Sequence, residues 1–115
     1  MIEFTHTVNN FSNLELLCEG HAGVKGTSLS CAAASALMAA ASAAMEKRNP
    51  PRLLIETRDG YCRILCEYNI HTAEIAMVTI CGFEWLAQQA PEEVTCRRKS
   101  AGKGNAKKNQ TISKK

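Results

Sequence analysis

The sequence predicts a small, single α+β domain in which a mixed or antiparallel sheet of about five strands packs with two helices, in the order ββαββαβ. Three observations predict this fold. The chain has 115 residues, which suffices for one hydrophobic core but not for two domains. Short apolar or alternating segments bounded by turn residues are typical of strands. Two longer segments have the composition or spacing of helices, and they are expected to cover one or both faces of the sheet.

The first segments predict a hairpin. Residues 2–8 alternate apolar and polar side chains, and residues 14–19 are short, apolar and compatible with a strand. Turn residues, including Asn9-Asn10, lie between them. We therefore expect two neighbouring antiparallel strands at the start of the domain.

An alanine-rich segment follows and predicts a helix of about four to five turns, beginning close to Cys31. Ser28 or Ser30 is expected to cap its first turn. Asn49-Pro50-Pro51 is expected to end it, because proline disfavours the helical conformation in the residue before it.

A second hairpin is predicted next, since Asp59-Gly60 between residues 52–57 and 61–68 is a strong signal for a tight turn. In the returning strand, alternate residues share a face, which places Cys62 and Cys66 on the same side. We interpret both thiols as core residues.

The remaining segments predict a second helix and a last strand. Between residues 72 and 89, apolar positions recur at helical spacing, and Pro91 ends the pattern. Gly82 interrupts it and indicates a close approach to another backbone. Residues 94–98 are expected to add a strand.

Residues 1–99 therefore form the predicted domain, and residues 100–115 are predicted to be a disordered basic tail. The tail contains five lysines and no acid, so the net charge of +3 for the whole chain becomes −2 for the domain. The domain surface is not expected to bind nucleic acid. The tail is either a solubilising extension or a weak, non-specific contact with RNA or the ribosome.

Composition also indicates a compartment. No signal peptide is apparent at the N-terminus, and the apolar segment 31–45 is too short and too rich in alanine and serine for a membrane span, so no membrane association is expected. Without a secretory signal, the six cysteines are expected to be reduced thiols in the cytoplasm. Paired CxxC motifs are missing from the sequence, so we expect neither a metal site nor a cofactor.

One histidine and one cysteine indicate chemistry. His21 lies in Gly20-His21-Ala22-Gly23, and Cys31 lies where the alanine-rich helix begins. Amides in the first turn of a helix carry partial positive charge, which favours the thiolate, the reactive form of cysteine. An imidazole can accept the thiol proton and later return it to a leaving amine. The pattern therefore predicts a cysteine nucleophile beside its general base, with amides after Cys31 stabilising an oxyanion.

Other residues near this pair are expected to support it. Ser35 lies one turn after Cys31 and either hydrogen-bonds the thiolate or bonds back to a helix carbonyl. Gly20 and Gly23 are expected to shape the turn around the histidine, and Gly26 to give the loop mobility.

The order of these motifs resembles the ribosomal-processing cysteine protease family, Prp. The similarity is carried by Gly20-His21-Ala22, the glycine-containing loop and Cys31-Ala32-Ala33-Ala34-Ser35, within residues 1–99. The resemblance implies a small α+β domain, usually a homodimer, that removes the N-terminal extension of a large-subunit ribosomal protein. It also implies that Cys31 is the nucleophile and His21 the general base.

The third catalytic group and two alternative functions stay open at this point. Asp59 is the only aspartate and lies in the predicted hairpin turn, so we expect a dyad or a triad completed by a carbonyl or a glutamate. One alternative is a non-catalytic, ribosome-associated binding module on the same scaffold. Another is a redox-sensing thiol protein, which needs a resolving cysteine that the sequence does not place near Cys31.

Overall fold

A computed structural model describes residues 1–8, 13–22 and 28–99, and it confirms the predicted order ββαββαβ. The tail predicted for residues 100–115 lies outside the described residues. In chain order the elements are β1 (Ile2–Val8), β2 (Asn13–Glu19), α1 (Leu29–Arg48), β3 (Leu54–Arg58), β4 (Tyr61–Glu67), α2 (Ile70–Gln89) and β5 (Val94–Arg98).

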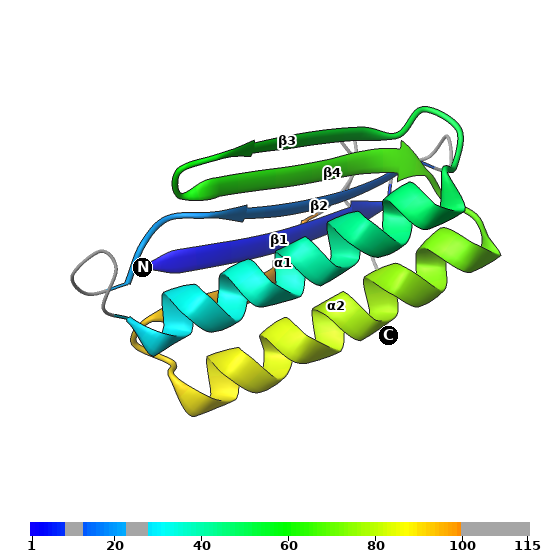
Figure 1. Cartoon of the computed structure of the whole chain (residues 1–115). Coiled ribbons are helices and arrows are strands. Elements are labelled where there is room, and N and C mark those ends of the chain that lie inside the picture. The colour runs from blue at the N-terminus through cyan, green and yellow to red at the C-terminus, as the bar shows by residue number, and fades with distance from the viewer. Residues whose placement is uncertain (9–12, 23–27, 100–115) are drawn as a thin grey trace.

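The five strands form one mixed sheet in the order β3-β4-β2-β1-β5. The pairs β1·β2, β2·β4 and β3·β4 are antiparallel, whereas β5 runs parallel to β1. Figure 1 shows both helices on the same face of the sheet. Alternation along each strand places the remaining side chains on the opposite face, which carries charged and polar residues together with Leu17, Leu54 and Leu65.

The ends of α1 follow from local sequence. Ser28 is the N-cap, and its hydroxyl accepts a hydrogen bond from the amide of Cys31. Asn49 ends the helix in the left-handed conformation, with φ of 49°, and its amide bonds to the carbonyl of Met45. The predicted end before Pro50 is therefore confirmed, and Ser28, rather than Ser30, is the cap.

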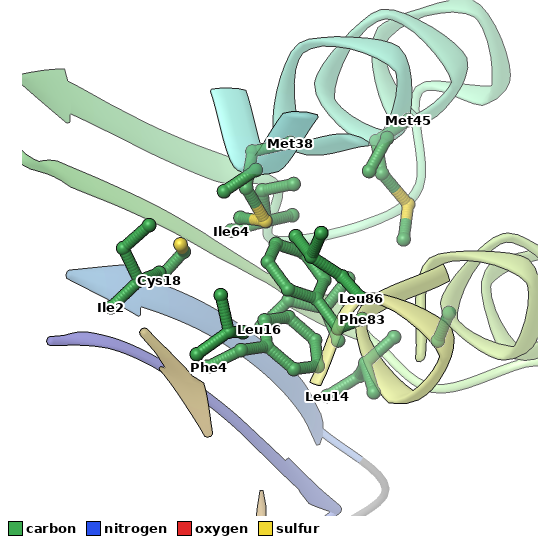
Figure 2. Close-up of a cluster of buried hydrophobic side chains, with 14 of the residues drawn as sticks. Ile2, Phe4, Leu14, Leu16, Cys18, Met38, Met45, Ile64, Phe83 and Leu86 are labelled. Carbon is green, nitrogen blue, oxygen red and sulfur yellow. The ribbon is translucent and has the colours of Figure 1, made fainter. Parts of the chain in front are cut away.

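The core lies between the sheet and the helices. The rings of Phe4 on β1 and Phe83 on α2 stack at a centroid distance of 4.0 Å. Figure 2 shows them beside Leu16 and Ile64, with the methionines of α1 on the helix side of the cluster. Alternate residues of β1, β2 and β4 thus supply one layer of the core, and the helices supply the other.

By length and apolar composition, α1 is the helix in the described part of the chain that meets the criterion for a membrane span. Its side chains Ala34, Met38, Ala41 and Met45 are buried in the core. Buried side chains along one side are typical of a helix that packs on a core. Of the 18-residue apolar segment of α1, 28% is buried.

The second helix begins at Ile70, two residues before the predicted start. Asn69 caps it by accepting bonds from the amides of His71 and Thr72, and the Thr72 hydroxyl accepts a bond from the amide of Asn69. The expectation that Gly82 approaches another backbone is wrong. A Cβ at this position would lie 2.6 Å from the side chain of Leu37, so Gly82 makes room for that side chain of α1.

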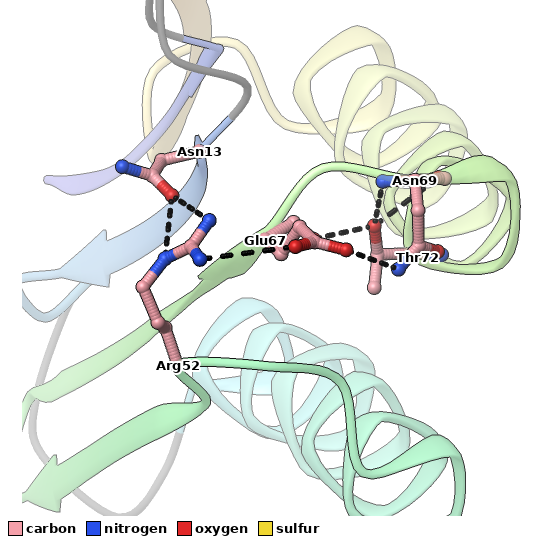
Figure 3. Close-up of polar contacts among 5 residues, drawn as sticks. All are labelled: Asn13, Arg52, Glu67, Asn69 and Thr72. Atoms are coloured by element: carbon pink, nitrogen blue, oxygen red, sulfur yellow. Dashed lines mark hydrogen bonds and ion pairs between the residues drawn. The ribbon is translucent and has the colours of Figure 1, made fainter.

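Polar contacts join four segments at the far end of the sheet. Arg52 donates two hydrogen bonds to the side-chain oxygen of Asn13 and lies 3.7 Å from a carboxylate oxygen of Glu67. Figure 3 shows these groups continuing to Asn69 and Thr72 at the start of α2. The contacts connect β2, the α1–β3 connection, β4 and α2.

Candidate active site

Cys31 lies in the first turn of α1, with its sulfur beside the end of β2. The amide of Ala22 donates to Sγ at 3.2 Å, and the thiol lies 3.6 Å from the carbonyl oxygen of Ala22. Cys31 is half-buried, and Ala22 is buried. A backbone amide aimed at the sulfur stabilises a thiolate, in addition to the field of the helix N-terminus.

Two amides in the first turn of α1 are already engaged, and one of them, that of Ala32, is among the amides after Cys31 that were expected to stabilise an oxyanion. The amide of Cys31 donates to the hydroxyl of Ser28 at 3.2 Å, and the amide of Ala32 donates to the carbonyl of Ser28 at 3.2 Å. Capping therefore uses these donors, since an N-cap residue satisfies the first amides of its helix. The amide of Ala22 is the backbone donor that reaches the sulfur.

His21 follows β2, is exposed, and lies against the β3–β4 turn. A Cβ on Gly60 would lie 2.5 Å from Nε2 of the imidazole and 3.0 Å from Cε1. The amide of Gly20 donates to the carbonyl of Gly60 at 2.9 Å, which holds the turn beside the histidine segment. The absence of a side chain at position 60 therefore makes room for the ring.

Sequence reasoning missed this neighbour. It interpreted Asp59-Gly60 as a turn signal alone, yet the structure places Asp59 and Gly60 in the lining of the cavity that contains His21. The sequence predicts the hairpin turn itself. A local pattern does not show which other loop the turn contacts in the folded domain.

Gly20 also has a backbone reason to be glycine. Its φ is +105°, and a Cβ there would overlap the backbone carbonyl of Met1. The expected role of Gly20 in the turn around the histidine agrees with this geometry. Gly23 and Gly26, for which a role in the loop is also predicted, lie outside the described residues.

A cavity of about 640 Å³ unites the predicted residues. Its walls are the outer face of α1, the end of β2 and the β3–β4 hairpin. His21, Cys31, Ser28, Ser35 and Gly20 all line it. The face of α1 consists mainly of small side chains, which are Ala32, Ser35, Ala39, Ser42 and Ala43. Small residues on one wall leave an open groove beside the thiol.

The contacts within the cavity differ in detail from the expectation. Within the described part of the chain, no hydrogen bond joins the imidazole of His21 to Sγ of Cys31. Ser35 makes neither of its two expected bonds with described residues. Catalytic hydrogen bonds are often long or absent without substrate and tighten when it binds.

Two further thiols, those of Cys18 and Cys62, line this cavity. Cys62, predicted to be a core residue, is half-buried and lines it, whereas Cys66 is fully buried as predicted. Burial raises the pKa of Cys18 to about 12, and negative charge on Cys62 and Cys31 adds to the shift.

Among the described residues, no group of three His, Cys, Asp or Glu side chains is placed to hold a metal ion.

Comparison with known proteins gives a structural likeness without a sequence match. No protein-family model and no curated protein sequence matches the chain. The ribosomal processing protease Prp from S. aureus, solved with a covalently linked product peptide, is similar with a TM-score of 0.73 and 23% identity over 86% of this chain and 100% of that chain. The same protease with a substrate peptide gives a TM-score of 0.69 at 21% identity, over 86% of this chain and 100% of the other.

A third solved structure, SMU.848 from Streptococcus mutans, gives a TM-score of 0.69 at 25% identity, over 87% of this chain and 95% of that chain. All three similarities cover most of both chains. A fold alone does not establish an activity, so these similarities support a statement about the fold. The chain has the fold of the ribosomal processing protease Prp.

Proposed function

We propose that this protein is a cysteine endopeptidase that removes the N-terminal extension of a large-subunit ribosomal protein. The observation that carries the proposal is the position of the Cys31 thiol, at the N-terminus of α1 in a cavity that it shares with His21. The fold adds support, because the Prp structures with this fold contain a substrate peptide and a covalently linked product peptide.

The chemistry follows from these groups. His21 accepts the thiol proton of Cys31, and the thiolate attacks the scissile carbonyl carbon to form a tetrahedral intermediate. The imidazolium then gives its proton to the departing amine, which leaves an acyl-enzyme thioester. Water activated by the same imidazole hydrolyses the thioester and restores the thiol.

The cavity also suits an extended peptide. The small side chains of α1 let a peptide backbone approach the helix, and the β3–β4 hairpin forms the opposite wall. Arg58 lies over the ring of Tyr61 at 3.7 Å, so the hairpin presents an aromatic and a cationic group at the cavity edge. The proposed substrate is therefore a chain segment rather than a small metabolite.

The proposed setting is the cytoplasm, where the six cysteines stay reduced, and the proposed assembly is a homodimer. The lysines of residues 100–115 are proposed to contact RNA or ribosome phosphates weakly and without sequence preference.

Cleavage of a synthetic peptide tests the proposal. The peptide spans the N-terminal extension of the large-subunit ribosomal protein and several residues beyond it, and the products are identified by mass spectrometry. We expect one cut for the wild type and a loss of at least about a hundredfold in kcat/KM for Cys31→Ala and His21→Ala. Cys81→Ala and His71→Ala are matched controls, because both residues are exposed on α2, away from the cavity.

The alternative function, a non-catalytic ribosome-associated binding module, gives a different result. It is favoured by the missing hydrogen bond between His21 and Cys31, and it predicts that the peptide binds with unchanged length. Binding of the peptide without cleavage contradicts the proposed peptidase. Cleavage at the wild-type rate in Cys31→Ala contradicts it as well.

A further inference from the structure

Ser30 is the residue through which the first turn of α1 packs into the domain. Leu29 before it is 88% exposed, whereas Ser30 is 7% exposed and begins the row of buried α1 residues that continues through Ala34 and Met38. A buried hydroxyl needs a hydrogen-bond partner, because burial removes its bonds to water. Cys31 directly follows Ser30, so a group that binds Ser30 also restrains the backbone of the proposed nucleophile.

The partner of Ser30 is Glu93, which lies directly before β5. The hydroxyl of Ser30 donates to a carboxylate oxygen of Glu93 at 2.6 Å, although the two residues are 63 positions apart in the chain. A hydrogen bond to a carboxylate is stronger than one between neutral groups. The contact therefore joins the start of α1 firmly to the connection between α2 and β5.

The backbone of Glu93 is held on both sides. Its carbonyl accepts a hydrogen bond from the amide of Ile2 at 2.7 Å, and its amide donates to the carbonyl of Ala90 at 3.0 Å. Val94, the next residue, is 1% exposed and belongs to the core. The half-buried Glu93 side chain thus extends from a backbone fixed by β1, by the end of α2 and by the core. This makes Glu93 a rigid anchor for Ser30.

The other contacts near the thiol restrain the first turn less directly. Ser28 caps α1 from the adjoining residues, so the cap orders the turn without placing it against another element. The amide of Ala22 contacts the sulfur of Cys31 rather than the helix backbone. Within the described part of the chain, the bond from Ser30 to Glu93 is the one between two side chains that joins this turn to another segment.

Glu93 has two effects on Cys31, and they have opposite signs. A negative charge near a thiol disfavours the thiolate, so the carboxylate charge works against activation of Cys31. A hydrogen bond that holds the first turn favours attack on a substrate, because a small displacement of a nucleophile slows the reaction strongly. Any benefit of Glu93 to Cys31 therefore comes from its hydrogen bond to Ser30.

We propose that Glu93 is a positioning residue for the proposed nucleophile. Through its hydrogen bond to Ser30 it fixes the first turn of α1, so that the thiol of Cys31 lies against the amide of Ala22 and faces the cavity. The inference rests on the proposed function and adds to it a residue that does not line the cavity.

Two variants separate the hydrogen bond from the charge. Glu93→Gln keeps an oxygen that accepts the bond from Ser30 and loses the charge, whereas Ser30→Ala keeps the charge and loses the bond. The measured quantities are the rate of iodoacetamide labelling of Cys31, relative to a small-molecule thiol, and kcat and KM for the peptide substrate. Each is measured under conditions in which denaturation curves show the variant to be folded, so lower stability alone does not change it.

Ser30→Ala is expected to lower kcat at least about tenfold and to slow labelling of Cys31 at least about threefold, because the thiol loses its position against Ala22. KM is expected to stay within about twofold, since Ser30 does not line the cavity. Glu93→Gln is expected to keep at least about half of both wild-type rates.

A double variant tests whether Glu93 acts through Ser30. Because Ser30→Ala and Glu93→Ala remove the same bond, the double variant is expected to be no slower than Ser30→Ala alone. Glu92→Ala is the matched control and is expected to behave as the wild type, because Glu92 is the exposed neighbour of Glu93. If Ser30→Ala fails to fold, Glu93→Ala is compared with Glu93→Gln in its place.

Three results overturn the proposal. They are wild-type labelling and kcat in Ser30→Ala, a loss in Glu93→Gln as large as that in Ser30→Ala, and additive losses in the double variant. The labelling readout needs no peptide cleavage. Slower labelling in Ser30→Ala of a protein that does not cut the peptide therefore supports this inference and contradicts the proposed function. Cleavage that depends on Cys31 but is unchanged in Ser30→Ala overturns this inference alone.

Discussion

The imidazole of His21 lies beside the β3–β4 turn because position 60 has no side chain. A methyl group there would lie 2.5 Å from Nε2, well inside contact distance. Gly60 also has a φ of +69°, a conformation that other residues adopt at a cost of about 1 to 2 kcal/mol. The absence of a side chain at this position therefore permits both the conformation of the turn and the position of the proposed base.

Gly60→Ala is predicted to displace the ring of His21 and to lower kcat/KM for peptide cleavage by roughly a hundredfold, the usual contribution of a general base. The free energy of unfolding is expected to fall by only about 1 to 2 kcal/mol. Peptide cleavage and chemical denaturation measure the two effects. Gly82→Ala is the control, because its new methyl group meets the movable side chain of Leu37. Full activity in Gly60→Ala contradicts the role given to His21.

A second prediction concerns His6, whose ring stacks with Phe4 at 6.0 Å. Burial, and then the charge of Arg98, lower the pKa of His6, while the charge of Glu84 opposes the shift. The unfolded chain therefore binds this proton more readily than the folded domain, so His6 reduces stability as pH falls below the ordinary histidine value. From about pH 7.5 to about pH 5.5, His6→Gln is expected to lose less thermal stability than the wild type. His71→Gln is the control, because His71 is exposed. Equal losses of thermal stability in His6→Gln and the wild type contradict this account of the burial of His6.

At the scale of elements, the N-terminus of α1 orients the thiol. Ser28 caps the helix through the amide of Cys31, and Ser30 donates to a carboxylate oxygen of Glu93 at 2.6 Å, which ties the first turn to the start of β5. The two contacts thus hold the residues that directly precede Cys31. Its orientation relative to Ala22 depends on this cap.

Ser28→Ala is predicted to lower the free energy of unfolding by about 1 kcal/mol and to slow alkylation of Cys31, because the first turn loses its cap. Asn69→Ala removes the cap of α2 and serves as the matched control. It is expected to destabilise the domain without changing the reactivity of Cys31. The two variants are compared by denaturation and by the rate of iodoacetamide labelling. Equal labelling rates contradict a role for the cap in orienting the thiol.

The elements themselves could be predicted from local patterns. Alternation defined β1, the alanine-rich composition with Asn49-Pro50 defined the end of α1, and Asp59-Gly60 defined the second hairpin. These signals depend on residues close together in the chain, so the sequence contains them directly.

The neighbours of the site could not be predicted in the same way. The turn at Gly60 meets His21, and Cys62 joins the cavity of Cys31, only because β4 pairs with β2. Alternation along β4 indicated an inward side chain at position 62 but not whether core or cavity lies there. The error on Gly82 has the same origin, since a gap in a helical pattern does not identify the group that fills it.

At the scale of the whole molecule, one face of α2 remains apolar and exposed. Ile70, Met77, Val78 and Trp85 are between 60% and 74% exposed and recur at spacings that keep them on one side of the helix. The helix contains no lysine or arginine, and its charged residues are the exposed Glu74 and Glu84. In the proposed homodimer, we expect a second copy of this chain to cover this face.

Trp85→Lys is predicted to shift the protein from dimer to monomer in sedimentation equilibrium, because the substitution replaces the large aromatic side chain of this face with a charge. Leu54→Lys, on the exposed side of β3, is the control for a dimer formed through the sheet. A monomeric wild type, or a dimer disrupted by Leu54→Lys alone, contradicts association through α2.

The most direct measurement of the central claim is the rate at which iodoacetamide labels each cysteine of the native protein at neutral pH. A small-molecule thiol is the reference, because Cys81 lies on the exposed face of α2 that the proposed dimer covers. Activation of Cys31 by the helix terminus and His21 predicts labelling at least about tenfold faster than this reference thiol, with the difference reduced in His21→Ala. If Cys31 reacts no faster than the reference thiol, Cys31 is not activated, and the proposed peptidase is contradicted.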